Sequence, residues 1–178
     1  MEDCQYTRRD WRGQEINVHI LYEPLLFNNY DCCSKATLGI DDGSKIYLTF
    51  RCYIDCKKIN YIYIDDIQGD HSALPINHYG TMLLSALFEF MVYIENEYHI
   101  KFSYICGNLN PEDKHIYLKK RKKYLSDFYI DAIPYIKQYV PHKNISIEFY
   151  KGSNADTALE GTAILHACYF KYIIKEED

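Results

Sequence analysis

Apolar and polar residues alternate along several short segments in the first part of the chain. These segments are 16–22, 36–40, 45–56 and 60–68, and the last is a run of Ile and Tyr that ends in two carboxylates. A period of two is typical of β-strands that bury one face. The pair Asp42-Gly43 favours a tight turn, because such residues tolerate the positive φ angles that the turn requires. We expect successive strands here to form an antiparallel meander.

The period of the pattern changes from Asn77 to about Glu97. Polar residues in this stretch recur every three or four positions, and Leu, Phe, Met and Ile fill most of the others. This spacing predicts a helix that is buried on most of its circumference. A helix of this kind packs against the face of a sheet, with a narrow stripe left for solvent.

A strand over 99–106 and a turn at 107–109 are predicted next, followed by a helix that starts at 110–113. The helix start has the sequence Asn-Pro-Glu-Asp. Asn caps a helix, Pro suits its first position, and acids are favoured at the positive end of the helix dipole. We expect this helix to continue to about Asp127.

The last third of the chain is less regular. Pro134 and Pro141 bound a short helical or irregular piece, and 144–150 reads as a strand. Residues 155–174 fit a strand or a helix, and periodicity does not decide between them. The expected fold is α/β (α+β): a single domain over 1–178 with a central mixed, mostly antiparallel sheet flanked by helices.

Composition narrows the function classes. With 48% apolar residues and no long apolar run, the chain has material for a core but not for a membrane span. The first residues lack the pattern of a signal peptide, so we expect a cytoplasmic protein. The net charge of −5 disfavours a protein that mainly binds nucleic acid.

The seven cysteines cannot all pair within one chain, because their number is odd. We therefore expect reduced thiols that behave as small buried apolar groups. A zinc site is the alternative, although tetrahedral sites usually show two tight Cys or Cys/His pairs.

The segment 61–84 contains the most informative chemistry. It predicts a strand that runs through a loop into a helix whose first turn contains residues 77–81, Asn-His-Tyr-Gly-Thr. The free N–H groups and the dipole at such a helix start favour a phosphate group. Gly80 would let a ligand approach the backbone, and Thr81 adds a hydroxyl donor. An ordinary strand-to-helix turn is the alternative interpretation.

The same segment resembles part of the GNAT acyltransferase family. Residues 62–67 followed by 77–84 are similar to the fourth strand of that family and its pyrophosphate-binding turn. Further along, 105–110 and 125–129 resemble its fifth strand and the Phe-Tyr end of its next helix. The resemblance covers roughly residues 60–130 and depends on the order of the pieces more than on one motif.

This resemblance implies the transfer of an acetyl or other acyl group from acyl-CoA, with acetyl-CoA as cosubstrate, to an amine acceptor. The amides of the first helical turn would hold the pyrophosphate, and the end of the preceding strand would hold the pantetheine arm. The cofactor-binding residues that it implies are Ile67, Gln68, His78, Tyr79, Gly80, Thr81 and Asn110.

The resemblance also implies a general acid and a general base. Tyr129 would donate to the departing thiolate, since a phenol is protonated at neutral pH. Asp66, or Asp65 through water, would accept a proton from the amine. Regular strand alternation puts these two carboxylates on opposite faces, so we expect only one of them to face the cleft.

Departures from the family pattern keep alternatives open. His78 stands at the place of the first glycine, and Pro75 stands where the family has Arg or Gln. No pair of amphipathic helices appears in the first 45 residues, so the acceptor, a small molecule or a protein, is not defined. A degenerate binding module is one alternative. A nucleic-acid-associated protein that uses the basic run 119–123 is another, although that run also fits a solvated surface. A homodimer is left open.

Overall fold

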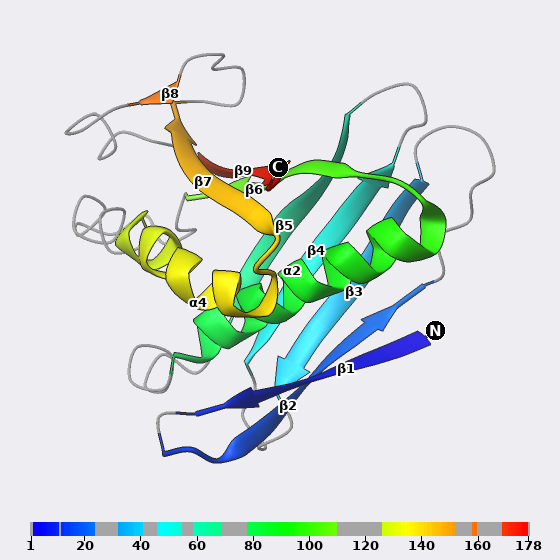
Figure 1. Ribbon diagram of the computed structural model, residues 1–178, viewed down its shortest axis with the longest axis vertical. Helices are drawn as coiled ribbons and strands as arrows, with labels where there is room; N and C mark the ends of the chain where they lie inside the picture. Colours follow the sequence, from blue (N-terminus) through cyan, green and yellow to red (C-terminus); the bar gives the residue numbers. More distant parts are fainter. Residues whose placement is uncertain are drawn as a thin grey trace.

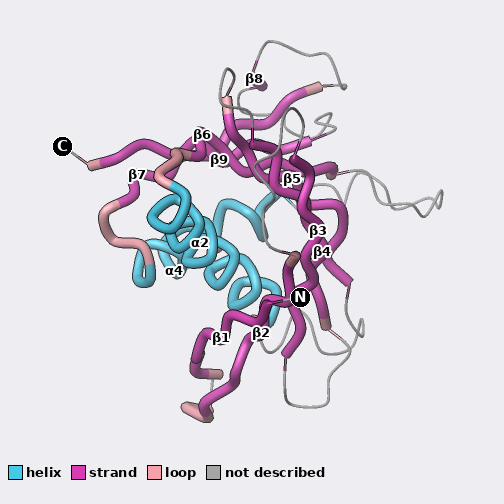
Figure 2. The backbone as a smooth tube through the Cα atoms, turned by 90° about the vertical axis from the view of Figure 1, so that its right-hand side faces the viewer, coloured by secondary structure: helices cyan, strands magenta, loops and turns pink. Residues whose placement is uncertain are grey.

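The structure, a computed structural model, describes residues 2–10, 12–23, 32–40, 46–54, 59–68, 78–109, 126–151, 158–159 and 169–177. The described strands form one mixed sheet with the order β1-β2-β3-β4-β5-β6-β9-β7-β8. The described helices lie together on one side of this sheet (Figures 1 and 2). The fold is therefore α+β, with a sheet that is antiparallel except at one pair of strands.

The first half of the sheet is the antiparallel meander that the alternating pattern predicted. It contains β1 (Glu2–Arg9), β2 (Glu15–Tyr22), β3 (Cys32–Ile40), β4 (Tyr47–Ile54) and β5 (Asn60–Gln68). Strand β1 was not predicted. Its residue Arg8 faces inward and is only 2% exposed, so the strand does not show the apolar alternation of its neighbours.

Helix α2 (Tyr79–Tyr98) follows β5 and covers the inner face of the meander. Phe90 packs edge-on against Phe50 of β4, with 5.7 Å between ring centroids. Phe88 meets Tyr172 in the other half of the sheet at 5.5 Å. The prediction of a helix buried on most sides is confirmed, because even Ser85 and Glu95 are buried. In the described part of the chain, no helix is long and apolar enough to cross a membrane.

The second half of the sheet begins with β6 (Phe102–Asn108), which pairs in parallel with β5. Residues 126–131 are helical and lead into α4 (Ile133–Tyr139), where Pro134 lies in the first turn. The chain then forms β7 (Lys143–Tyr150), β8 (Ala158–Leu159) and β9 (Tyr169–Glu176). Because β9 inserts between β6 and β7, three strands far apart in sequence become neighbours.

The structure corrects one sequence prediction for this half of the sheet and settles another. The turn expected at Gly107 and Asn108 is wrong, because both residues belong to β6. The open question at the C-terminal end is settled for 169–176, which form a strand. The predicted helix start at 110–113 and the basic run 119–123 lie outside the described residues.

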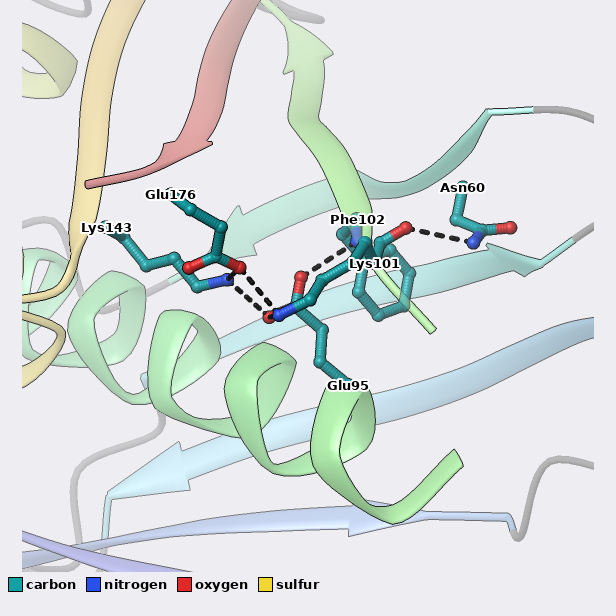
Figure 3. Close-up of polar contacts among 6 residues, drawn as sticks. All are labelled: Asn60, Glu95, Lys101, Phe102, Lys143 and Glu176. Carbon is teal, nitrogen blue, oxygen red and sulfur yellow. Dashed lines mark hydrogen bonds and ion pairs between the residues drawn. The ribbon is translucent and has the colours of Figure 1, made fainter. Parts of the chain in front are cut away.

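A partly buried ionic cluster joins the end of α2 to three strands (Figure 3). Lys143 donates to Glu95 at 2.6 Å and to Glu176 at 2.7 Å. Glu95 also accepts the backbone N–H of Phe102 at 2.8 Å, and Lys101 donates to Glu176 at 2.6 Å. The cluster therefore ties α2 to β6, β7 and β9 at the end of the sheet where α2 ends.

Candidate functional site

Strands β5 and β6 separate at the end of the sheet where α2 begins. They pair from Asn60 and Phe102 to Ile64 and Gly107, and no pair is formed beyond this point. Strand β5 nevertheless continues to Gln68 and stays paired with β4, where Leu48 lies opposite Ile67. In the described chain, residues 65–68 therefore have no strand partner on the β6 side. A main-chain edge of this kind can pair with an extended ligand.

The separation occurs at Gly107, where the β6 backbone is closely surrounded. A Cβ atom on Gly107 would lie 3.0 Å from the carbonyl oxygen of Ile64 and 3.0 Å from Cε1 of Phe170. The absence of a side chain at Gly107 lets β5 and the ring of Phe170 approach this backbone together.

The N-terminus of α2 lies at the same end of the sheet, because α2 follows β5 and runs back across the sheet. Its N-cap residue His78 is exposed, has a φ of 55°, and makes no side-chain capping hydrogen bond. The first turn contains no acidic residue. Among the described residues, this helix start has neither a side-chain cap nor an acid in its first turn, and the positive end of a helix dipole favours an anion.

Gly80 lies against the ring of Phe128 and not against an open space. A Cβ atom on Gly80 would be 2.8 Å from Cζ of Phe128, which belongs to the helical segment 126–131. The interpretation that Gly80 admits a ligand on this side is therefore corrected: the glycine admits an aromatic ring of the same chain. First-turn N–H groups point along the helix axis, away from this contact.

Tyr129 is buried next to Phe128 and is only 5% exposed. Its ring stacks on Phe170 with 3.8 Å between centroids, and its backbone carbonyl accepts the hydroxyl of Tyr172 at 2.6 Å. Burial raises the pKa of the Tyr129 hydroxyl well above its usual value, and the negative charge of Asp66 raises it further. The charge of Asp66 therefore acts on Tyr129, although the two residues come from distant parts of the sequence.

The two adjacent carboxylates of β5 lie at a β-bulge. Ile64 pairs with Phe50 and Asp66 pairs with Thr49, so Asp65 is the extra residue. The prediction that the carboxylates face opposite ways assumed regular alternation, and the bulge interrupts it. Both carboxylates are exposed, and Asp65 is paired with Arg51, whose Nε lies 3.1 Å from Oδ2. Asp66 is the one whose charge acts on Tyr129.

The predicted residues therefore gather around one end of the sheet. Contacts link Gly80 to Phe128, and the charge of Asp66 reaches Tyr129. The last two residues of β5, in the part that does not pair with β6, are Ile67 and Gln68. The start of α2 contains His78, Tyr79 and Thr81. Tyr79 is buried and Thr81 is half-buried, so the first turn is only partly accessible. Asn110 lies outside the described residues.

Sequence reasoning missed two aromatic residues of this region. Phe128 covers Gly80, and Phe170 supports Tyr129 from β9. The sequence predicted Phe128 as part of a buried helical stripe and of a Phe-Tyr pair but not as a contact of Gly80, and no local pattern marks Phe170. Both act through contacts between distant segments, which periodicity does not report.

Within the described ranges, no group of three or more His, Cys, Asp or Glu side chains could hold a metal ion. Cys4, Cys52 and Cys106 are reduced thiols. Burial raises the pKa of Cys106 to about 12, so this thiol is a poor nucleophile at neutral pH.

No protein-family model, curated protein or solved structure matches the chain.

Proposed function

We propose that the protein binds acyl-CoA between β5 and β6 and transfers the acyl group, acetyl from acetyl-CoA in the simplest case, to an amine. The observation that carries this proposal is the separation of a parallel strand pair beside an uncapped helix start. The first feature offers hydrogen bonds to an extended pantetheine arm, and the second favours a pyrophosphate. The GNAT resemblance supplies the same order of strand, helix and parallel strand.

In the proposed mechanism, the pyrophosphate contacts the amides of Tyr79, Gly80 and Thr81, and the pantetheine arm extends along 65–68. The amine nitrogen attacks the thioester carbonyl carbon, and the carbon–sulfur bond breaks. The proton lost by the amine passes to Asp66, and the hydroxyl of Tyr129 donates a hydrogen bond to the departing thiolate. Tyr129 is protonated at neutral pH, and its raised pKa limits it to donating a hydrogen bond to the thiolate without losing its proton.

Binding of acetyl-CoA can be tested by making the same substitution, His to Asp, at each end of α2 in two separate variants. His78 and His99 both have positive φ angles, 55° and 54°, and flank the same helix. His78→Asp adds a negative charge where the pyrophosphate would bind, so we expect it to weaken acetyl-CoA binding about tenfold or more. His99→Asp makes the same change at the far end and should leave the affinity unchanged. Isothermal titration calorimetry measures both.

The binding proposal fails if the wild-type protein shows no heat of binding at millimolar acetyl-CoA. It also fails if the two variants lose affinity equally, because the site would then not lie at the start of α2. Thermal melting of each variant confirms that the fold is retained.

Transfer is tested separately by the release of free CoA thiol in the presence of polyamines, amino acids and lysine peptides. Tyr129→Phe should lower turnover by about 10²-fold or more and change the acyl-CoA affinity little, because the hydroxyl acts on the leaving group. An unchanged rate would assign the donor role to another group.

A binding module without transferase activity is the second candidate. The burial of Tyr129 and the ring of Phe128 over Gly80 favour it, because both reduce access to the first turn of α2. Acetyl-CoA binding without thiol release for any of these amines would support this candidate over the enzyme.

A further inference from the structure

Strand β1 forms one edge of the described sheet (Figure 1). All eight of its residues, Glu2 to Arg9, pair with β2 in an unbroken register. No described residue pairs with its outer edge. Strand edges in native proteins are usually protected by bulges, prolines, charged side chains or short length, because an open edge invites another strand. Strand β1 is eight residues long and has no bulge and no proline, so its backbone permits strand addition, and its charged side chains decide which strand can pair with it.

The charges of β1 indicate which strand would fit this edge. Asp3, Gln5, Thr7 and Arg9 are the exposed residues on one face of the strand, with the acid near the start and the base at the end. An antiparallel neighbour with the same sequence places its own Arg9 near Asp3. The edge is therefore complementary to itself.

The register follows from the geometry of a two-fold axis. An axis through Tyr6 and perpendicular to the sheet pairs Asp3 with Arg9, and Gln5 with Thr7, on the same face of a continuous sheet. Centring the axis on Gln5 would instead pair Glu2 with Arg8. Arg8 is buried, donates to Ser85 at 2.7 Å and pairs with Glu89, so it has no side chain to offer. The Tyr6 register uses the exposed charges instead.

The face of the sheet that carries the helices adds a second observation at the same edge. A cavity of about 580 Å³ lies between α2 and the end of α4, and Tyr6 forms part of its wall together with Tyr93 and Tyr139. Tyr6 is only partly buried, on the inner face of the edge strand. A second copy paired through Tyr6 would bring its own Tyr6 beside this wall and extend the aromatic lining across the axis.

We propose that β1 is a homodimerisation edge, which pairs antiparallel with β1 of a second copy about a two-fold axis at Tyr6. The resulting contact is isologous, with two Asp3–Arg9 pairs, and it joins the two sheets into one. In the described part of one chain, Asp3 meets His19 at 3.0 Å and Arg9 meets Glu15 at 3.3 Å, and both contacts are exposed. Their exposed positions leave them accessible to a second chain.

Charge exchange tests this pairing directly. Asp3→Arg and Arg9→Asp each create two like-charged pairs across the axis, so each variant should dimerise about tenfold more weakly than wild type, or worse. An equimolar mixture of the two variants should form a heterodimer, because one chain then carries a base at both contact positions and the other carries an acid at both. The double variant should dimerise like wild type. Sedimentation equilibrium at protein concentrations up to about 100 µM measures each case.

Asp131→Arg is the matched control, since it makes the same charge change on an exposed residue far from β1 in the sequence. It should not alter the dimer. A wild-type protein that stays monomeric up to about 100 µM overturns the proposal. So does a dimer that both single variants leave intact, or a mixture in which no heterodimer forms. Thermal melting of each variant excludes loss of the fold as the cause.

Discussion

Gly107 pairs with strands on both sides and is in close contact with backbone and with an aromatic ring. It is the last residue of β6 that pairs with β5, and it also pairs with Phe170 on the other side. Its backbone lies close to a carbonyl oxygen and to an aromatic ring, and that ring supports Tyr129. A side chain at this position would push on β5 and on the stack behind Tyr129 at once.

We expect Gly107→Ala to destabilise the protein by about 1–3 kcal/mol, because a Cβ atom overpacks a site bounded by backbone. Urea unfolding followed by circular dichroism measures this change. Ser103→Ala is the control, since Ser103 is an exposed residue of the same strand and should shift the free energy of unfolding by less than about 0.5 kcal/mol. Equal effects of the two substitutions would refute the crowding argument.

At the scale of elements, the contact between α2 and β7 depends on a buried ion pair. The side chain of Glu95 is 1% exposed and that of Lys143 is 6% exposed. The second oxygen of Glu95 accepts the first N–H group of β6, so the carboxylate has partners on both sides. Removing one charge from such a pair leaves the other buried without compensation.

Lys143→Met should therefore cost about 3–5 kcal/mol of unfolding free energy, because it removes the buried partner of Glu95 and leaves the exposed Lys101, 4.0 Å away, as its cationic neighbour in the cluster. Lys101→Met is the matched control: that side chain belongs to the same cluster but is 67% exposed, and its loss should cost less than about 1 kcal/mol. Chemical denaturation compares the two. Adding Glu95→Gln to Lys143→Met should recover part of the loss, and no recovery would show that the effect is packing alone.

At the scale of the whole molecule, the same cluster couples stability to pH. Hydrogen bonds from Lys101, followed by those from Lys143, lower the pKa of Glu176 from 4.5 to about 2. A carboxyl group whose pKa is depressed by folding adds stability above its unfolded pKa, and this stability is lost as the pH falls through the folded value. The contribution of Glu176 is therefore present above pH 4.5 and disappears toward pH 2.

We expect Glu176→Gln to flatten the pH dependence of the melting temperature between about pH 4.5 and 2 and to lower the melting temperature at neutral pH. Glu176 is 52% exposed, so solvent and salt weaken the effect, and about 0.5 M NaCl should reduce the difference between variant and wild type. Thermal melts at several pH values provide the measurement. Parallel pH curves for variant and wild type would contradict the assignment.

The alternating and helical patterns predicted most of the elements. Strand β5 has the predicted bounds, and β2, β7 and α2 differ from their predicted bounds by one or two residues. Strand β1 was missed because a buried arginine replaces an apolar residue in its alternation. Arg8 is accepted in the interior only because Ser85, Glu89 and the ring of Tyr139 surround it, and those partners come from α2 and α4.

For the candidate site, the sequence indicated the helix start and the carboxylates but not what surrounds them. The charge of Asp66 acts on Tyr129, which is consistent with their proposed roles, and catalysis by these residues stays a prediction. The sequence did not predict the β-bulge at Asp65 or the packing of the Phe128 ring against Gly80. Each depends on a partner in another element: Thr49 and Phe50 of β4 for the bulge, and Phe128 for the cover.

The sequence by itself determined most of the strands and the long helix, because side-chain direction repeats every two residues in a strand and about every 3.6 in a helix. Only the tertiary structure decided that β9 lies between β6 and β7, that β5 and β6 separate after Gly107, and that β1 is left at an edge. These features follow from contacts between residues far apart in sequence. No local period encodes such contacts, and packing selects among the alternatives that local patterns allow.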